Sequence, residues 1–450
     1  MIVVKFGGTS VGDASAIARA ASIVAERMQR SPMVVVSAAA GTTNALLSLA
    51  EQAAKGHLIG AVRAVEGIRE RHLRMCDELL GPEHADVPAE MGAMCDELAG
   101  LAEALATLGH VTPRSLDAIA SYGEQMSSLL VTAAFASRGI PAAHVDARDI
   151  VVTSEHFTEA EPLLGAITER ARERVLPIVR DGSVPVMGGY IGATSAGITT
   201  TLGRGGSDFS ASLVGAALDA EEIQIWTDVD GMLTADPRVV DAARLIPEIR
   251  FDEASELASF GAKVLHPSTI APAVRRGIPV FIYNARNPAG RGTRITFDAP
   301  RRPVTAIAAR DGVTVVKVNA PRMLLAQGFL RAVFEIFERH RTSVDVVATS
   351  EISVSATLDD AARLDELIVD LRQLGDVAVE RDRGIVAIVG SGIGDRGDCM
   401  GRALVALGEI RIHMLSLSAT GINLTAVVDA AAVPEAMRRL HAAMFMESAA

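Results

Sequence analysis

The sequence predicts an α/β protein with a mainly parallel sheet, followed by two smaller ferredoxin-like units. Short apolar strands alternate with helical patterns through residues 1–298, which is the order typical of βαβ units. Beyond Pro300-Arg301-Arg302-Pro303, the order strand, helix, strand, strand, helix, strand occurs twice, with a period of about seventy residues. The chain has 450 residues, 49% hydrophobic and 22% charged, so about three domains can each bury a core.

Composition argues against several classes of function. A net charge of −12 and an aromatic content of 4% disfavour binding to nucleic acid or to an anionic membrane. The cysteines Cys76, Cys95 and Cys399 are scattered without a C-x-x-C pair, so neither a disulfide framework nor a zinc site is indicated. The chain begins with a strand containing Lys5, unlike a signal peptide, and no apolar run approaches about 18 residues. We therefore expect a soluble, cytoplasmic protein.

The first strands are followed by loops of small residues. Residues 2–6 form an apolar strand that ends at Gly7-Gly8-Thr9-Ser10, and a helical pattern then runs from about residue 13 to 30. A second buried strand at 33–36 runs into the small-residue loop 37–44. Ligands of parallel sheets bind at the carboxyl ends of the strands, where such loops gather.

Residues 57–110 are helical in pattern and rich in Glu, Arg and Ala. Breaks at Gly81-Pro82 and near Val87-Pro88 predict two or three helices that cover the sheet. We interpret their charges as a solvated face rather than as catalytic groups.

The stretch Ser121-Tyr122-Gly123-Glu124 contains a candidate binding carboxylate. Gly123 permits a close approach, and Glu124 is expected to begin a helix. A carboxylate in the first turn of a helix commonly only compensates the helix dipole. If Glu124 instead faces the glycine loops, it can receive a substrate ammonium group.

A glycine-rich stretch, 203–208, lies between an apolar segment and a helical pattern. Its three glycines allow backbone amides to approach an anion, and the dipole of the following helix favours the same charge. Arg204 offers a planar fork for a carboxylate or phosphate, and Asp208 can hold a cation or orient a lysine. The alternative is an ordinary glycine turn capped by Ser207.

Further polar residues follow the strand at 223–227. It ends in Asp228-Val229-Asp230-Gly231, a turn with two acids at the carboxyl end of a strand. Downstream, Lys263 either reaches a phosphate or is solvated, and His266, which precedes a proline, is more often structural than a ligand.

The C-terminal repeat has an incomplete second copy. The expected elements of both copies are strands at 313–318, 344–348, 352–358, 377–381, 385–389, 411–417 and 422–428, and helices at about 329–339, 361–373, 399–407 and from 434. The second copy lacks its last strand, and our hypothesis is that an extra strand at 304–308 completes it.

Five motifs in this order resemble those of aspartate kinase: Lys5-Phe6-Gly7-Gly8-Thr9-Ser10, Ser121-Tyr122-Gly123-Glu124, Thr201-Leu202-Gly203-Arg204-Gly205-Gly206-Ser207-Asp208, Trp226-Thr227-Asp228-Val229-Asp230-Gly231 and Phe260-Gly261-Ala262-Lys263-Val264-Leu265-His266-Pro267. The resemblance extends over nearly the whole chain. It implies an amino-acid-kinase (carbamate-kinase-like) sandwich at 1–298 and two regulatory ACT modules at 304–382 and 383–450.

The implied reaction is transfer of the γ-phosphoryl group of ATP to the β-carboxylate of L-aspartate, giving 4-phospho-L-aspartate. This is the first step of the pathway to lysine, threonine and methionine. The resemblance implies that Mg²⁺ arrives with ATP and is not ligated directly by the protein. By the same resemblance, the catalytic residues are Lys5 and Asp208; the substrate-binding residues are Thr43, Glu124, Arg204 and Ser207; and the nucleotide-binding residues are Lys5, Gly7, Gly8, Ser37, Thr227, Asp228, Asp230, Arg238 and Lys263. One departure is Leu233, which stands where many relatives carry a tyrosine near the nucleotide.

The first ACT module resembles the lysine-inhibited forms of the family. The implied allosteric residues are Met323, Gly328, Phe329, Leu330, Ser343, Val344, Asp345, Thr349, Ser350 and Glu351. Asp345 is the informative residue, because lysine has a side-chain cation for it and threonine has none. We expect L-lysine as the inhibitor and a homodimer or homotetramer assembled through the ACT modules.

Other readings are less consistent with the sequence. Gly392-Ile393-Gly394-Asp395-Arg396-Gly397 fits the dinucleotide fingerprint, but no acid ends the strand that follows, so we expect no dinucleotide there. A kinase acting on glutamate or acetylglutamate is disfavoured by the paired ACT modules and the 121–124 motif. A catalytically silent amino-acid sensor is disfavoured by the presence of Lys5, Arg204 and Asp208, and a fusion to homoserine dehydrogenase by the end of the sequence at Ala450.

Overall fold

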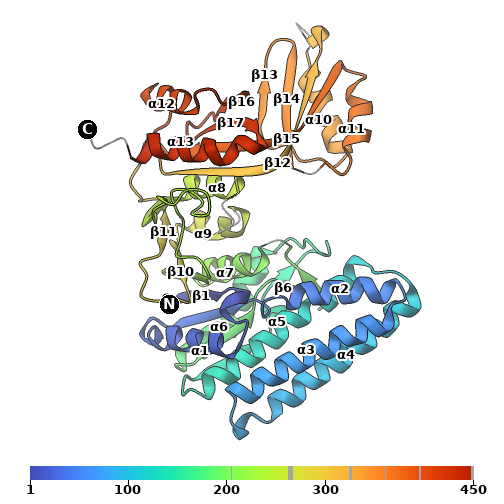
Figure 1. Cartoon of the computed structure of the whole chain (residues 1–450). Helices are drawn as coiled ribbons and strands as arrows, with labels where there is room; N and C mark the ends of the chain where they lie inside the picture. Colours follow the sequence, from blue (N-terminus) through green and yellow to red (C-terminus); the bar gives the residue numbers. More distant parts are fainter. Residues whose placement is uncertain (204, 262–266, 324–326, 360, 395–396, 447–450) are drawn as a thin grey trace. The chain divides into compact units, whose positions relative to one another are not determined.

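The computed structural model describes residues 1–203, 205–261, 267–323, 327–359, 361–394 and 397–446. These residues form two compact units (Figure 1). The first unit contains residues 1–232 and the described part of 264–298, and the second contains the described parts of 233–263 and 299–450.

A mainly parallel sheet forms the centre of the first unit, as the sequence predicts. Its neighbouring strands are, in order, β3 (Ala142–Val145), β5 (Val184–Gly188), β2 (Pro32–Val36), β1 (Ile2–Phe6), β8 (Ile223–Thr227), β10 (Val280–Asn284) and β11 (Thr293–Thr296). Only the pairing of β10 with β11 is antiparallel among these seven strands. Every residue of β1 and β2 is buried, because helices cover both faces of a parallel sheet.

Two groups of helices cover the two faces of this sheet. The first group shares a core with Ile2, Val4 and Phe6 of β1 and consists of α1 (Ala14–Ala25), α2 (Thr42–Ala54), α3 (Leu58–Leu79), α4 (Asp86–Leu108) and α5 (Pro113–Ala136). Within it, α3 and α4 lie side by side as two long helices (Figure 1), which confirms the helices predicted for 57–110, although they pack chiefly on α2 and α5. The other face is covered by α6 (Leu164–Arg180) and α7 (Gly206–Ala217), with α9 (Ala271–Arg276) packed on α7. Gly215 of α7 lies against Val3, whose side chain points away from the first group.

A small second sheet leads into the glycine-rich loop. It consists of β4 (Val152–Thr153), β6 (Ile191–Thr194) and β7 (Thr199–Thr201). Because β7 ends at Thr201 and α7 begins at Gly206, the glycine-rich loop lies between a strand and a helix, as expected.

The second unit is built on one six-stranded sheet. Its strand order is β13 (Val347–Thr349), β14 (Ser353–Leu358), β12 (Ala306–Asn319), β15 (Asp376–Val389), β17 (Asn423–Asp429) and β16 (Ile412–Leu417). Residues 306–310 pair with 385–389, the first strand of the second predicted copy.

Two pairs of predicted strands are in fact single long strands. The predicted strands 304–308 and 313–318 merge into β12, and 377–381 and 385–389 merge into β15. Register shifts follow Arg310 and Val313, and Gly312 has a φ of 76°. A β-bulge of this kind takes up the extra residues without ending the strand, so the sequence break was misleading.

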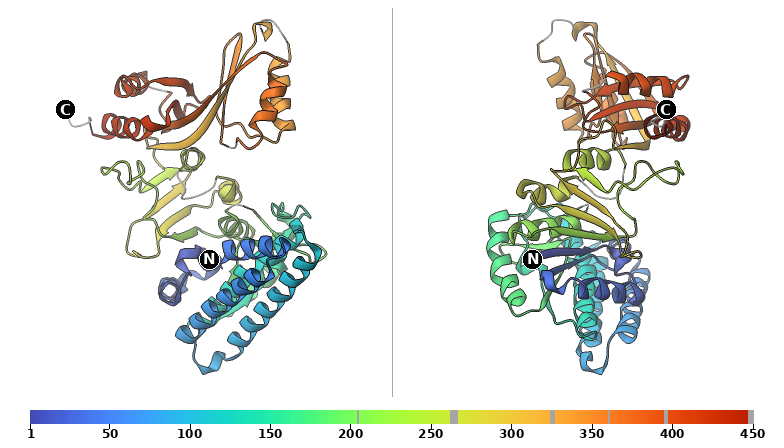
Figure 2. Two further views of the ribbon diagram at one scale, coloured as in Figure 1. Left: turned by 45° about the vertical axis from the view of Figure 1, so that its right-hand side comes forward. Right: turned by 90° about the vertical axis from the view of Figure 1, so that its left-hand side faces the viewer.

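Two helix pairs cover separate ends of this sheet (Figure 2). One core lies under α12 (Gly397–Leu407) and α13 (Val433–Phe445), and the other under α10 (Phe329–Arg339) and α11 (Leu364–Leu371). The segment 233–263, which precedes the expected boundary at 298, also belongs to this unit and contains β9 (Glu248–Arg250) and α8 (Phe251–Ser259). The buried carboxylate of Glu253 accepts hydrogen bonds from Thr305 and from the amide of Ser391, which ties α8 to the sheet. No helix in the described part of the chain is both long and apolar enough to cross a membrane.

Candidate active site

A lysine and an aspartate from distant parts of the chain form a nearly buried ion pair. Lys5 lies near the carboxyl end of β1, and Asp208 lies in the first turn of α7. Lys5 Nζ is 2.7 Å from Asp208 Oδ1, and their side chains are only 9% and 16% exposed. At this distance the ammonium group of Lys5 makes a charge-assisted contact with the carboxylate of Asp208. It places a cation and a carboxylate beside each other at the edge of the sheet.

The loops after β1 and β2 are in direct contact beside this pair. The amide of Ala40 donates to the carbonyl of Gly8 over 3.0 Å. A Cβ atom added to Gly8 would lie 2.9 Å from the carbonyl oxygen of Ala38, so only glycine fits there. Glycine at this position leaves both backbones free to approach a ligand.

The glycine-rich loop presents the amino end of α7 to the same region. Gly203 and Gly205 have φ values of 74° and 72°, and Gly205 is the N-cap of α7. Behind the loop, a Cβ atom on Gly189 would lie 2.7 Å from Cβ of Ser207. The close packing of the loop fixes the orientation of the amino end of α7. The first backbone amides of a helix and the positive end of its dipole point in the same direction, and together they favour binding of an anion.

Glu124 lies in the middle of α5 and does not begin a helix, which corrects the sequence expectation. Helix α5 begins at Pro113, capped by Thr112, eleven residues before Glu124 in the numbering of the chain. The carboxylate therefore does not compensate the helix dipole.

The carboxylate of Glu124 is buried, and only one of its two oxygen atoms accepts a hydrogen bond from the described residues. The side chain is buried, and its Oε1 accepts a hydrogen bond from the amide of Ala38 over 3.2 Å. Oε2 is buried and has no hydrogen-bond partner among the described residues. Burial raises the pKa of Glu124 to about 8, against the lowering effects of the Ala38 hydrogen bond and of Lys5. A buried acceptor of this kind is costly unless a ligand completes it.

These groups line one cleft of about 550 Å³. Seven predicted residues line it: Lys5, Gly8, Ser37, Thr43, Glu124, Ser207 and Asp208. Gly7 lies just behind, where an added Cβ would be 3.7 Å from Lys5 Nζ. The cleft thus combines a cation, glycine loops, a helix amino end and a buried carboxylate.

The other predicted nucleotide residues that the structure describes do not line this cleft. Asp230 lies after β8 and accepts a hydrogen bond from Asn284 over 2.8 Å. Thr227 and Asp228, at the same strand end, are likewise not among the residues around the cleft. Arg238 belongs to the second unit, where it pairs with Asp236 at 2.6 Å. Arg204, Lys263 and His266 lie outside the described residues. The roles of all these residues stay predictions.

Sequence reasoning missed Asp117, which holds two cleft segments in place. Its Oδ2 accepts from the amides of Thr158 (2.9 Å) and Thr201 (3.0 Å), and its Oδ1 accepts from the Thr201 hydroxyl (2.6 Å). Thr158 has a φ of 73° and lines the cleft, and Thr201 leads into the glycine-rich loop. The signal in the sequence was an acid among apolar residues on the buried side of a helix. Asn44, Glu159 and Tyr190 also line the cleft and were not predicted.

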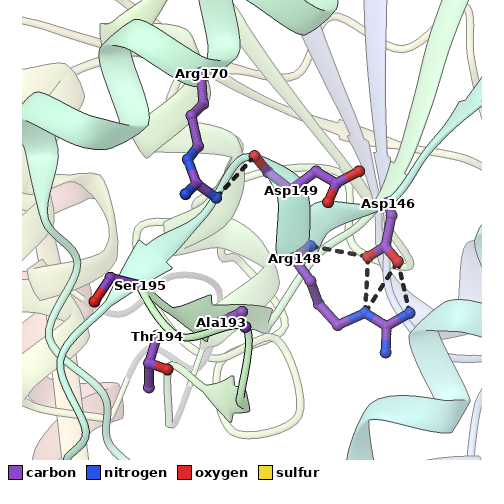
Figure 3. A pocket seen from close by; sticks show the side chains of 8 residues that line it. Asp146, Arg148, Asp149, Arg170, Ala193, Thr194 and Ser195 are labelled. Atoms are coloured by element: carbon purple, nitrogen blue, oxygen red, sulfur yellow. Dashed lines mark hydrogen bonds and ion pairs between the residues drawn. The ribbon is translucent and has the colours of Figure 1, made fainter.

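A second cavity, of about 260 Å³, has charged walls that are already paired (Figure 3). Arg148 forks onto the carboxylate of Asp146, with its Nη2 2.6 Å from Oδ2. Arg170 donates to the carbonyl of Asp149 over 3.4 Å. The side chains of Arg148 and Asp146 already pair with each other, and each is about one-third exposed, so we assign no function to this cavity.

The predicted effector residue Asp345 is paired within the second unit. Arg310 Nη2 is 3.0 Å from Asp345 Oδ2, and Arg310 also forms an ion pair with Asp359. Burial raises the pKa of Asp345, and Arg310 opposes this effect. Gly328, with a φ of 81°, is the N-cap of α10, whose first residues are Phe329 and Leu330.

Comparison with known proteins assigns the chain to a family. The amino acid kinase family matches residues 1–284, and the ACT domain matches residues 386–444. Over 454 residues the chain is 37% identical to the lysine-sensitive aspartokinase 3 of Escherichia coli, with 99% of each chain covered. The chain belongs to the aspartokinases.

Other aspartokinases are similar to this aspartokinase over almost all of its sequence. The chloroplastic aspartokinase 3 of Arabidopsis thaliana is 36% identical, with 98% of this chain and 81% of the plant protein covered. The crystal structure of Escherichia coli aspartokinase III with aspartate and ADP superposes with a TM-score of 0.87, covering 99% of this chain and 100% of that one. The lysine- and aspartate-bound form of the same enzyme gives a TM-score of 0.83, with 99% of each chain covered. The predicted fold class and family are confirmed.

Proposed function

We propose that this aspartokinase binds L-aspartate with its α-ammonium group on Glu124 and its β-carboxylate directed at the γ-phosphorus of ATP. The observation that carries this proposal is the buried Oε2 of Glu124, which has no hydrogen-bond partner among the described residues, in a side chain that lines the same cleft as the Lys5–Asp208 pair. An amino acid brings the cation that this oxygen lacks.

The remaining roles follow from the chemistry of phosphoryl transfer, which needs positioning and neutralisation of charge more than covalent help. Lys5 neutralises the transferring phosphoryl group, and the loop supplies a further backbone donor through Gly8, since the amide of Gly7 already donates to the carbonyl of Trp226 over 3.0 Å. Asp208 orients Lys5 across their 2.7 Å contact. Ser37, Thr43 and Ser207 supply hydroxyl groups around the reactants.

Further predicted residues complete the proposed binding of both substrates. Arg204, by its place between two glycines of the loop, forks onto the α-carboxylate of aspartate. Thr227, Asp228, Asp230, Arg238 and Lys263 hold the nucleotide.

Magnesium fits the donors of this cleft when it arrives with ATP. Mg²⁺ prefers oxygen ligands and commonly binds through one or two carboxylates together with substrate phosphates. Asp208, which pairs with Lys5, would help to place the metal–nucleotide without ligating the ion directly, and no cluster of three or more His, Cys, Asp or Glu suited to a metal occurs among the described residues. Bound Mg²⁺ supplies neutralisation of the phosphate oxygens, while Asp208 and Lys5 orient the groups around them.

The decisive experiment is ADP release by the purified protein with Mg-ATP and L-aspartate, with and without millimolar L-lysine. Aspartate-dependent turnover that lysine suppresses supports both the reaction and the regulation. Turnover without lysine sensitivity supports the kinase alone and transfers the effector question to threonine. Lysine binding without turnover favours the alternative of a catalytically silent amino-acid sensor.

We propose L-lysine as the feedback inhibitor, bound at Asp345 in the second unit. The lysine-sensitive Escherichia coli relative, whose structure was solved with lysine, supports this proposal. Arg310 already pairs with Asp345, so the ammonium of lysine has to displace its guanidinium group. Arg310 also donates to the carbonyl of Ser259, at the end of α8. Displacement would therefore disturb α8, which lies in the same unit as the predicted nucleotide residue Arg238.

Two substitutions test this competition in opposite directions. Asp345→Asn removes the charge that lysine needs, so the lysine concentration for half-inhibition should rise about tenfold or more. Arg310→Met removes the competing cation, so the same concentration should fall severalfold. Each value is measured by ADP release against the variant's own uninhibited rate, with the exposed Asp365→Asn as the control. Equal changes in the same direction would contradict competition.

We also propose a homodimer or homotetramer assembled through the second unit, whose domain boundaries at 304–382 and 383–450 remain our proposal. Leu330 and Phe334 on α10, and Leu415 and Leu417 on β16, are large apolar side chains between 38% and 42% exposed. Such side chains are candidates for burial in an interface. Sedimentation analysis should give at least twice the 47.1 kDa of one chain, and a monomer at micromolar concentration would refute the assembly.

A further inference from the structure

We propose that Arg71 is a positioning residue for phosphoryl transfer, which clamps together the two glycine-containing loops behind the cleft. This inference rests on the proposed function of these loops, in which the loop after β1 binds the transferring phosphoryl group and the loop after β2 surrounds the reactants. Arg71 lies on α3, in the region whose charges the sequence indicated to be a solvated face.

The guanidinium group of Arg71 joins two segments that are far apart in sequence. Its Nη1 donates to the carbonyl of Ala40 over 2.6 Å, and its Nη2 donates to the carbonyl of Gly12 over 2.7 Å. Ala40 belongs to the loop after β2, and Gly12 to the loop after β1. The side chain is only partly exposed, so a long, flexible residue is held in one conformation by two short hydrogen bonds.

The two loops touch each other on the side of the cleft as well. The amide of Ala40 donates to Gly8, and a Cβ on Gly12 would lie 3.1 Å from the Gly8 carbonyl oxygen and 3.4 Å from Cβ of Ala40. Arg71 therefore closes a ring of contacts that runs through Gly8, Ala40 and Gly12. A planar fork can reach both carbonyls at once, whereas the point charge of a lysine cannot reproduce that geometry.

The clamp has a chemical consequence beyond rigidity. The carbonyl of Ala40 and the amide of Gly41 belong to one peptide group, and Gly41 lines the cleft. A charged donor on that carbonyl polarises the peptide group and strengthens its amide as a donor. Arg71 thus fixes the position of the loops and adds positive potential behind them, although it does not itself line the cleft. Displacing reacting groups by about 1 Å costs up to about 100-fold in rate.

The test compares Arg71→Met and Arg71→Lys with Arg74→Met, an exposed arginine on the same helix. We expect kcat to fall about 10- to 100-fold in both Arg71 variants, and to stay within twofold in the control. Millimolar guanidinium, but not methylammonium, should restore kcat at least threefold in Arg71→Ala, measured well below its thermal midpoint. A merely structural residue would lower the thermal midpoint and leave kcat intact at low temperature. Should Arg71→Met show no folding transition, Arg71→Lys decides, and a kcat within twofold of wild type would overturn the proposal.

A loop variant separates this inference from the proposed function. Gly8→Ala places a Cβ against the carbonyl of Ala38 and should lower kcat if the loop binds phosphate. If Gly8→Ala is fully active, the assignment of the loop is wrong. If Gly8→Ala is impaired while both Arg71 variants are active, only the role of Arg71 is refuted.

Discussion

Replacing Lys5 by methionine should lower the kcat of this aspartokinase by about 10²- to 10³-fold, while the protein stays folded. The ammonium group lies 2.7 Å from Asp208 at the edge of the cleft, with only 9% of the side chain exposed. A nearly dry cation stabilises the charge that develops on a transferring phosphoryl group far more than an exposed one does. Without it, Asp208 faces the triphosphate as an unpaired negative charge. Steady-state ADP release at saturating Mg-ATP and aspartate measures the effect.

Lys55→Met is the matched control, because Lys55 is exposed and forms only a 3.7 Å contact with Glu51. Its kcat should stay within twofold of wild type. In the double variant Lys5→Met/Asp208→Asn, we expect less loss than the product of the two single losses, since the second change removes the orphaned charge. A Lys5→Met enzyme with more than a tenth of wild-type kcat would remove this lysine from the mechanism.

Replacing Glu124 by glutamine should raise the KM for aspartate by about 100-fold at pH 8, because a charged acceptor for the α-ammonium group is lost. The pKa of Glu124 is about 8, so the free enzyme carries a proton on this group at lower pH. That proton has to leave before the carboxylate can accept a cation. The kcat/KM of the wild type for aspartate should therefore rise with pH up to about 8 and then level off. The glutamine variant should lack this rise, as kcat/KM measured between pH 6 and 9 will show.

The same substitution should stabilise the fold in alkaline solution. The folded-state pKa lies above the ordinary glutamate pKa of 4.5. Between these two pH values the unfolded chain releases a proton that the folded chain keeps, so stability falls as pH rises, and it levels off above about 8. Glutamine carries no charge and escapes this loss, which is at most on the order of 5 kcal/mol. Thermal unfolding at pH 9 should give a higher midpoint for Glu124→Gln than for wild type, with the exposed Glu51→Gln unchanged. An equal or lower midpoint would argue against a buried, strained carboxylate.

Gain of stability together with loss of substrate affinity is the pattern expected of a binding group. A buried carboxylate that lacks a partner destabilises the protein, and the ammonium group of the substrate provides that partner. A carboxylate with a structural role would show loss of stability on substitution instead.

Much of the catalytic unit could be predicted from the sequence because its signals are local. Alternating apolar strands and helical patterns predicted a parallel sheet, and the glycines at 8, 203 and 205 marked close backbone approach or positive φ. Since the carboxyl ends of parallel strands meet at one edge, Lys5 and the loop after β2 were expected near each other. The contact between Lys5 and Asp208, 203 positions apart in the numbering, was expected only through the family resemblance.

Other parts of the site depended on packing and were invisible in the sequence. Glu124 was expected in a first turn, but its helix begins at Pro113, so the residue is buried in the middle of α5. Asp117 resembles any isolated acid until β7 and Thr158 pack against it. Arg71 resembled a surface residue, yet its two partners lie 31 and 59 residues away.

The sequence by itself determined the order of elements, the repeat and the family of this protein, because propensity and periodicity act over a few residues. Only the tertiary structure decided that β12 and β15 run on through breaks in their patterns, and that the described part of segment 233–263 belongs to the second compact unit. It alone paired Asp345 with Arg310, 35 positions apart. Such contacts depend on which surfaces meet when whole elements pack. The degree of burial then sets the strength of the interaction between the charged groups.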